Sequence, residues 1–226
     1  MSGWKATRPD GTDWHTGRID YGSAVGSVLD PGLSGEGPFP GSGWLHLATV
    51  PTECAGMSWP CRLFEVAPLG LVVTAPGHPH KVGCTAVRVV REVDACLALG
   101  PQGRQVAALI ARAQSMTADD VAALDAAWAA AGDAALDAAW DAAWAAARDA
   151  ARDAAWDAAL NAAWAAAWAA ARDAARDAAW AAAGDAAGAL ITRDLIPTGH
   201  YAALAGPWAA VMGWPHPGDR DDEEDT

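Results

Sequence analysis

Between Leu124 and Gly188 the sequence repeats in steps of four residues. Two positions of each step are Ala as far as Ala183, a third alternates among Leu, Trp, Arg and Gly, and the fourth is mostly Asp. Alanine has the highest helix propensity of all residues, and no proline interrupts the repeat. The repeat therefore predicts one long helix over residues 117–188, which at about 1.5 Å per residue forms a rod of roughly 100 Å.

Both ends of this helix carry sequence signals. Thr117 with Asp120 three residues later resembles a capping box, which places the helix start there. Gly184 and Gly188 are natural stops, since glycine commonly ends helices. Asn161 is a weak breaker, and a break near it, which would fold the rod into a hairpin, stays open as an alternative.

The period of the repeat limits what a straight rod can bury. Each four-residue step advances a helix by about 40° beyond a full turn. From Trp128 to Trp180 the advance is about 520°. The row of Leu, Trp, Arg and Gly residues, one from each step, therefore winds more than once around the axis of a straight helix. The usual single apolar face is therefore missing. A repeat longer than about 3.6 residues favours a right-handed supercoil with neighbouring helices.

Tryptophans on such a rod need cover, because each buries roughly 150–250 Å² when it packs and an exposed apolar strip usually marks an interaction surface. One alternative is that they pack on the chain's own first half. We favour self-association, since a rod of this length extends beyond a domain of about 100 residues. The predicted interaction residues are Trp128, Trp140, Trp144, Trp156, Trp164, Trp168 and Trp180.

Acidic residues are concentrated in the repeat and at the C-terminal end. The formal net charge is −13, of which residues 1–117 contribute zero, 118–188 contribute −8 and 219–226 contribute −5. Nucleic-acid binding needs a basic footprint and is not expected. A membrane partner is not expected either, because interfacial helices carry many Lys and Arg. With no signal segment and no uncharged run long enough to span a bilayer, we expect a cytoplasmic protein.

The cysteines form no Cys-x-x-Cys pair. His78, His80 and Cys84 lie close in sequence and carry metal-binding atoms, but their Pro-Gly-His-Pro-His setting indicates a loop. We therefore predict no metal site and no cofactor. The thiols are predicted to be reduced and mostly buried: Cys54, Cys61, Cys84 and Cys96.

Residues 1–100 have a different character, because Gly and Pro clusters separate short apolar runs. This pattern predicts a small β-rich domain with an irregular loop over Asp30–Gly43. The predicted strands are Trp4–Thr7, Trp44–Val50, Arg62–Ala67, Gly70–Ala75 and Cys84–Arg91, with a short helix over Pro51–Met57. The predicted core is Leu63, Val66, Leu71, Val73, Val87 and Val89, with Trp59 and Phe64 over one face.

The predicted fold class is α+β, with the long repeat helix between a β-rich domain and a short helical cap. Apolar residues at Val106, Leu109, Ile110 and Ala113 indicate an amphipathic connector helix. Two short helices, Ala189–Leu195 and Thr198–Met212, form the cap. The predicted organisation is 1–100 β-rich domain, 101–116 connector, 117–188 repeat helix, 189–214 cap and 215–226 disordered acidic tail.

Two runs carry a resemblance to known families. RLFEVAPLG from Arg62 and HKVGCTAVRVVREV from His80 look like the second half of a small uncharacterised domain of phage and bacterial proteins. They are similar, more loosely, to the C-terminal half of rifampin ADP-ribosyltransferases, which read YIVEPTG and later LRVVGEV. The segment after Gly188 resembles the close of an Ala-rich repeat family of actinobacterial and phage proteins.

The transferase resemblance implies a catalytic His on the first strand and a catalytic Tyr on the second. The matching places hold Lys5-Ala6-Thr7 and Leu45 or His46, so neither residue type is retained. His46 is instead expected to be a partly buried strand histidine. Asp13, His15 and Asp20 form a polar loop without a recognised catalytic spacing. The sequence therefore predicts no catalytic residue.

The function expected from the sequence is that of a non-catalytic interaction or structural protein that self-associates through its repeat helix. The alternative is an ADP-ribosyltransferase-like enzyme or a degenerate nucleotide-binding domain. A third idea, an acidic decoy of nucleic acid, fits poorly with the Trp residues between the acidic positions.

Overall fold

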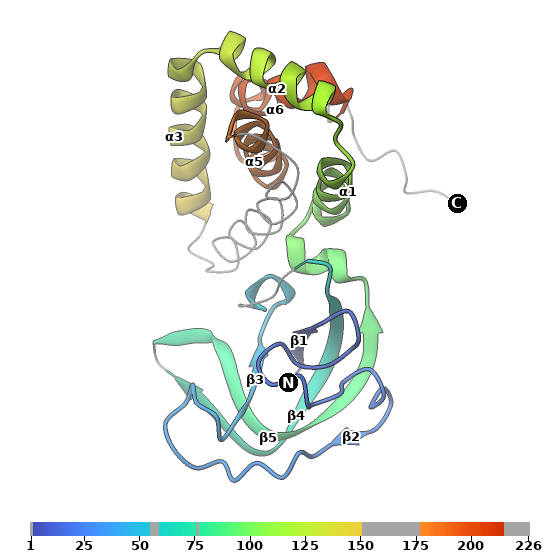
Figure 1. Cartoon of the computed structure of the whole chain (residues 1–226). Helices are drawn as coiled ribbons and strands as arrows, with labels where there is room; N and C mark the ends of the chain where they lie inside the picture. Colours follow the sequence, from blue (N-terminus) through green and yellow to red (C-terminus); the bar gives the residue numbers. More distant parts are fainter. Residues whose placement is uncertain (1, 55–58, 76, 151–176, 215–226) are drawn as a thin grey trace, which may run out of the picture. The chain divides into compact units, whose positions relative to one another are not determined.

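A computed structural model of the chain describes residues 2–54, 59–75, 77–150 and 177–214. These residues divide into two compact units, a β unit within residues 2–101 and a helical unit within residues 102–214 (Figure 1). Each unit is described by itself below.

The β unit is an antiparallel sheet that closes on itself. Its sheet order is β2-β5-β3-β1-β4, and β4 also pairs with β5, so four of the strands form a ring. Closure of this kind removes the free edges of those strands. The elements are β1 (Gly3–Thr7), β2 (Val28–Leu29), β3 (Leu45–Ala48), η1 (Pro51–Glu53), β4 (Arg62–Ala75), β5 (His78–Val93) and η2 (Ala95–Leu99).

The two strands predicted over 62–67 and 70–75 are one strand, β4, in the structure. The glycine that suggested a break, Gly70, has a φ of +70° and lies in a register shift between Leu69 and Val72. Such a bulge bends a strand without ending it. It lets the long β4–β5 hairpin curve around the barrel. The irregular loop predicted over Asp30–Gly43 is confirmed.

The barrel core contains most of the predicted apolar residues. Val66, Val87 and Val89 are fully buried in one cluster with Phe64. Leu71 is wrong as a core residue, because it is 58% exposed and lies within the bulge of β4 between Leu69 and Val72. The bulge thus takes Leu71 out of the core.

The single helix predicted over 117–188 is wrong, and with it the fold class built on a long rod. Gly132 has a φ of +80° and separates two helices, which then fold against other helices of the same unit. The helices described are α1 (Gly103–Gln114), α2 (Ala118–Ala131), α3 (Asp133–Ala150), α5 (Asp177–Thr192) and α6 (Thr198–Met212). The possible hairpin break at Asn161 lies outside the described residues.

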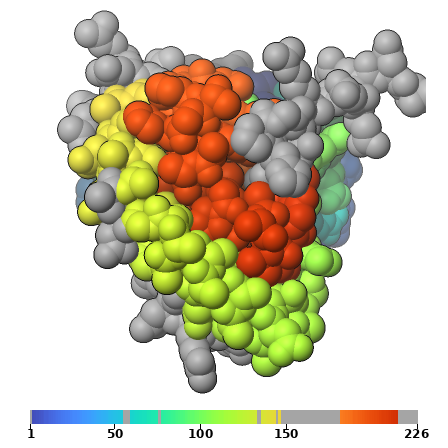
Figure 2. All heavy atoms as spheres, turned by 90° about the horizontal axis from the view of Figure 1, so that it is seen from above, coloured from blue at the N-terminus to red at the C-terminus, as the bar shows by residue number. Residues whose placement is uncertain are grey.

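The break at Gly132 has a physical reason in the period of the repeat. A stripe that drifts by about 40° per step stays on one side of a helix for only a few steps. Because α2 ends after 14 residues, the row of large residues begins again on a new helix, α3, with its own orientation. Leu124 on α2 and Leu136 on α3 are then both buried. Helix α6 packs against α2, α3 and α5, and Figure 2 shows it beside the first two.

Helix α5 continues through the glycines that were predicted to end the repeat. Gly188 lies inside it, and the cap helix predicted over Ala189–Leu195 is wrong because α5 runs on to Thr192. A Cβ atom on Gly188 would lie 2.6 Å from Cη2 of Trp140, so this glycine provides space for an indole of α3. Every residue from Ala182 to Thr192 is buried, as expected of a helix without a polar face.

Other predictions for the helical unit are confirmed. Helix α6 covers the range predicted for the second cap helix. Helix α1 buries Val106, Leu109, Ile110 and Ala113 as the spacing indicated. The capping box of Thr117 and Asp120 is present. None of the helices described above combines the length and apolar composition that a bilayer crossing requires.

We predict that Gly188→Ala lowers the free energy of unfolding of the helical unit by about 1–3 kcal/mol, because the new methyl group overlaps the Trp140 ring. The matched control is Gly199→Ala in the first turn of α6, where a Cβ meets nothing within 4 Å and alanine is expected to stabilise the helix by about 0.4–1 kcal/mol. Urea unfolding followed by circular dichroism measures both. Equal midpoints for the two variants would contradict this account.

Candidate functional site

A cavity of about 690 Å³ opens in the β unit where β1 and β3 separate. These strands pair at Trp4 and Ala48 alone, and irregular chain between β1 and β3 covers the gap. The volume lies in the range typical of small-molecule sites. Three tryptophans line the cavity, Trp4, Trp14 and Trp44. The cavity therefore combines aromatic walls with the polar groups described next.

Lys5 faces the interior of the barrel. It is in register with Phe64 on β4, and residues paired across a sheet share one face. Phe64 is fully buried and stacks on Tyr21, with 6.3 Å between the ring centroids. The Nζ atom of Lys5 donates a hydrogen bond to the carbonyl oxygen of His46 (3.2 Å) and lies 5.5 Å from the centroid of the Tyr21 ring.

The amine of Lys5 forms no ion pair with a carboxylate of the described residues. Burial lowers the pKa of Lys5, and the nearby Cys54 and Asp13 offset only part of that effect. An interior ammonium group with one hydrogen bond is costly, because desolvation disfavours charge. The amine is thus poised either to lose its proton or to receive an anion.

Asp13 also lines the cavity, but its carboxylate is satisfied by hydrogen bonds from its own loop. It is 4% exposed and accepts hydrogen bonds from both the backbone N–H and the hydroxyl of Thr16 (2.6 and 2.7 Å). The backbone N–H groups of Arg18 and Ile19 also donate to it (3.1 and 2.9 Å). Burial raises the pKa of Asp13, but these bonds outweigh burial and hold it below its ordinary value. Asp13 therefore organises the loop.

Two donors lie next to the cavity without partners. The hydroxyl of Tyr21 and Nε1 of Trp14 make no hydrogen bond among the described residues, and both atoms are shielded from solvent. Burial raises the pKa of Tyr21, so its hydroxyl keeps its proton. Buried donors without acceptors are rare in folded proteins. Because both atoms are shielded, they are not part of the cavity's accessible wall.

His46 stands at the rim of the cavity on β3, half-buried as expected. Its Nε2 lies 2.9 Å from the carbonyl oxygen of Gly41, so this nitrogen carries a proton. Burial lowers the pKa of His46, the bond to Gly41 raises it, and the charges of Lys5 and Lys81 lower it further. These effects favour the neutral ring and identify a region of positive charge around it.

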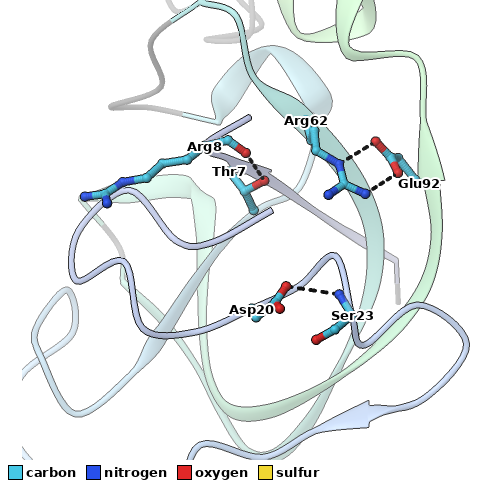
Figure 3. A network of polar contacts seen from close by, with 6 residues as sticks. All are labelled: Thr7, Arg8, Asp20, Ser23, Arg62 and Glu92. Carbon is cyan, nitrogen blue, oxygen red and sulfur yellow. Dashed lines mark hydrogen bonds and ion pairs between the residues drawn. The ribbon is translucent and has the colours of Figure 1, made fainter. Parts of the chain in front are cut away.

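Arg62 fixes the loop that carries Tyr21. Its guanidinium donates two hydrogen bonds to Glu92 (2.8 and 2.7 Å) and lies 5.1 Å from the Phe64 ring centroid (Figure 3). A Cβ atom on Gly11 or Gly22 would come within 2.7 or 2.6 Å of Nη1 of Arg62, so the loop backbone lies directly against the guanidinium.

Within the same loop, Asp20 accepts a hydrogen bond from the backbone N–H of Ser23 (3.0 Å), as Figure 3 shows. This bond, together with the carboxylate of Asp13, ties the polar loop singled out in the sequence from within. The third member of that group, His15, lines the cavity. No catalytic arrangement results from these three residues, but two of them border the candidate site.

The structure also explains what the sequence missed. Lys5 and His46 both line the cavity, and both belong to the segments, Lys5-Ala6-Thr7 and Leu45 or His46, that the sequence resemblance set against the transferase catalytic residues. They were not proposed as site residues because their types differ from those of the family. A usable signal was lysine content, since the chain has two lysines, Lys5 and Lys81, and both line this cavity.

The tryptophans predicted as interaction residues lie in the helical unit, not in the β unit that holds the cavity. Nε1 of Trp128 and Nε1 of Trp140 donate to the two carboxylate oxygens of Asp185 (3.0 and 2.7 Å) inside the helical unit. Asp185 is 6% exposed, and burial raises its pKa while the two indole bonds oppose the rise. These two indoles are partly buried within their own unit. Self-association through the repeat stays a prediction.

The remaining five predicted interaction residues are not described at side-chain level. Trp144 and Trp180 lie in α3 and α5, and only their backbone is described. Trp156, Trp164 and Trp168 lie outside the described residues.

The His-Cys group considered as a metal site lies on β5 and not in a loop. Cys84 is buried in the barrel core, and Nδ1 of His80 is 3.4 Å from the hydroxyl of Thr49. Among the described residues, no three His, Cys, Asp or Glu side chains are grouped so that they could hold a metal ion. Three of the four cysteines, Cys54, Cys61 and Cys84, are buried as predicted.

Comparison of the chain with protein-family models, with curated proteins and with solved structures finds no match. Neither of the family resemblances is tested by this outcome. The chemistry of the cavity therefore has to be argued from its own residues.

We predict that Asp185 makes the stability of the helical unit fall as pH rises. Its folded-state pKa is raised, so its contribution is complete below the unfolded pKa of about 3.9 and is lost as pH rises through the folded value. In Asp185→Asn this decline should disappear. Urea unfolding at a series of pH values between about 3.5 and 7 measures it. The control is Asp137→Asn, which changes an exposed carboxylate of α3 and should keep the wild-type decline.

Proposed function

We propose that the β unit is a binding module for a small anionic molecule that carries an aromatic ring. The observation that carries this proposal is the amine of Lys5, which lines the cavity with one hydrogen bond and no carboxylate partner among the described residues. The hydroxyl of Tyr21 and Nε1 of Trp14 lie buried near it, also without acceptors. A phosphate or carboxylate brings several acceptor oxygens and a negative charge, which are what these groups lack.

The cavity holds two amines that an anion could contact. Both lysines of the chain line it with His15 and His46, beside two carboxylates, Glu53 and Asp13, of which Asp13 is satisfied by its own loop. The chain as a whole has a formal charge of −13, which disfavours loose attraction of anions from solution. An anion is therefore expected to be held by direct contact in the cavity.

The walls support an aromatic ring. Trp44 is buried with its Nε1 donating to the carbonyl oxygen of Gly37 (3.3 Å), so its position is fixed. Trp4 and Trp14 add two further indole faces. Aromatic side chains stack on nucleobases irrespective of base identity. Mononucleotides combine a base with a phosphate and are the first class to test, which agrees with the nucleotide-binding alternative drawn from the sequence.

Binding is proposed without catalysis. In the transferase resemblance the catalytic His and Tyr are set against Lys5-Ala6-Thr7 and against Leu45 or His46, so neither residue type is retained, and Nε2 of His46 is engaged by the carbonyl oxygen of Gly41. Protonation should be coupled to binding, since an anion beside the Lys5 amine raises its pKa again. Ligand uptake should then take up a proton from solution.

We predict that adenosine monophosphate binds the full chain and that Lys5→Met weakens binding about ten- to a hundredfold, because a charge-assisted hydrogen bond contributes about 1.5–3 kcal/mol. Calorimetric titration measures the affinity, and titration in buffers of different ionisation enthalpy measures the proton uptake. The matched control is Arg88→Met, which removes an exposed cation of β5 away from the cavity.

If Lys5→Met and Arg88→Met weaken nucleotide binding equally, the effect comes from the overall charge of the chain, and the cavity is contradicted as the binding site. Failure of nucleotides, sugar phosphates and aromatic carboxylates alike to bind would remove the proposal. Binding of aromatic carboxylates alone would keep the anion site and replace the nucleotide.

A further inference from the structure

The amine of Lys5 has the surroundings of a nucleophile. It lies inside a barrel, its one hydrogen bond goes to a backbone carbonyl oxygen, and no described carboxylate pairs with it. Burial without a counter-ion favours the unprotonated amine, as its lowered pKa also indicates. Lysines in such settings attack carbonyl carbons because the nitrogen lone pair is free.

A proton donor lies beside this amine. The Tyr21 ring centroid is 5.5 Å from Nζ, and the Tyr21 hydroxyl is fully buried, protonated and without a partner among the described residues. The loop that carries Tyr21 is fixed by Arg62, so this arrangement does not depend on a ligand. The Lys5 amine and the Tyr21 side chain thus lie next to each other among the residues that line one cavity.

We propose that Lys5 forms a reversible imine with the carbonyl group of an anionic aldehyde or ketone bound in the barrel cavity. The inference rests on the proposed function, since the acidic group of the ligand is held by the same cavity. The cavity of about 690 Å³ has room for such a ligand beside the amine.

The step balances without an oxidant or reductant. The Nζ lone pair forms a bond to the carbonyl carbon, and the carbonyl oxygen takes a proton to give a carbinolamine. The carbon–oxygen bond then breaks, the oxygen leaves as water after a second protonation, and a carbon–nitrogen double bond remains. The amine releases the protons that the water carries away, and Tyr21 relays one of them. Addition of water reverses the sequence.

The lysine content of the chain makes the test direct. The full chain is incubated at neutral pH with pyridoxal 5′-phosphate, an anionic aromatic aldehyde, and the imine is reduced with cyanoborohydride. Intact mass gives the number of adducts, and peptide mapping assigns them, since Lys5 and Lys81 are the two side-chain amines present. We expect labelling of Lys5 at least tenfold faster than labelling of Lys81.

Two comparisons isolate the cause. Lys5→Arg should lose the rapid adduct, while Arg88→Met, a change on the exposed face of β5, should keep it. Because mapping is done on the wild-type chain, the outcome does not depend on the folding of a variant. Tyr21→Phe should slow the labelling of Lys5 severalfold, since it removes the proton relay and leaves the ring.

Pyridoxine 5′-phosphate, which has the same ring and phosphate but no carbonyl group, separates the two proposals. Slower labelling of Lys5 in its presence supports both. Rapid labelling without this protection supports the imine and contradicts anion recognition by the cavity. If Lys5 and Lys81 are labelled at equal rates and the competitor protects neither, both the anion site and the imine at Lys5 are contradicted. If the competitor binds but no adduct forms at Lys5, only the imine is contradicted.

Discussion

The arrangement of the helical unit follows from the mismatch between a four-residue repeat and a helix of about 3.6 residues per turn. A continuous helix would carry its Leu and Trp side chains around the whole axis. Gly132 interrupts it, so that Leu124 and Leu136 are both buried. The repeat then supplies large residues in α2 and α3 and a glycine in α5, where Gly188 receives the ring of Trp140. One repetitive sequence thus provides both the side chains and the spaces that they fill.

The two units each bury an ionisable group, and they treat it differently. In the helical unit, Asp185 receives an indole N–H on each carboxylate oxygen, so the group is satisfied by its own chain. In the β unit, the amine of Lys5 donates only one hydrogen bond, to the backbone carbonyl oxygen of His46. Buried polar groups are normally satisfied, and an incomplete set is unusual enough to mark a site. Asp185 is therefore a structural group, whereas Lys5 is the centre of the candidate site.

Local patterns predicted what depends on local structure. The spacing of Val106, Leu109, Ile110 and Ala113 identified the buried face of α1, and Thr117 with Asp120 identified a helix start. The long helix was wrong because propensity counts neighbours along the chain, while the break at Gly132 is favoured by contacts with helices remote in sequence. The cavity was missed for the same reason. Alternation places Lys5 on one face of β1, but only the closing of β4 on β5 makes that face an interior.

Lysine is confined to the cavity within these 226 residues. Arginine supplies the exposed cations of the strands, such as Arg88 and Arg91. Any chemistry directed at lysine side chains of this chain would therefore act on residues that line the cavity.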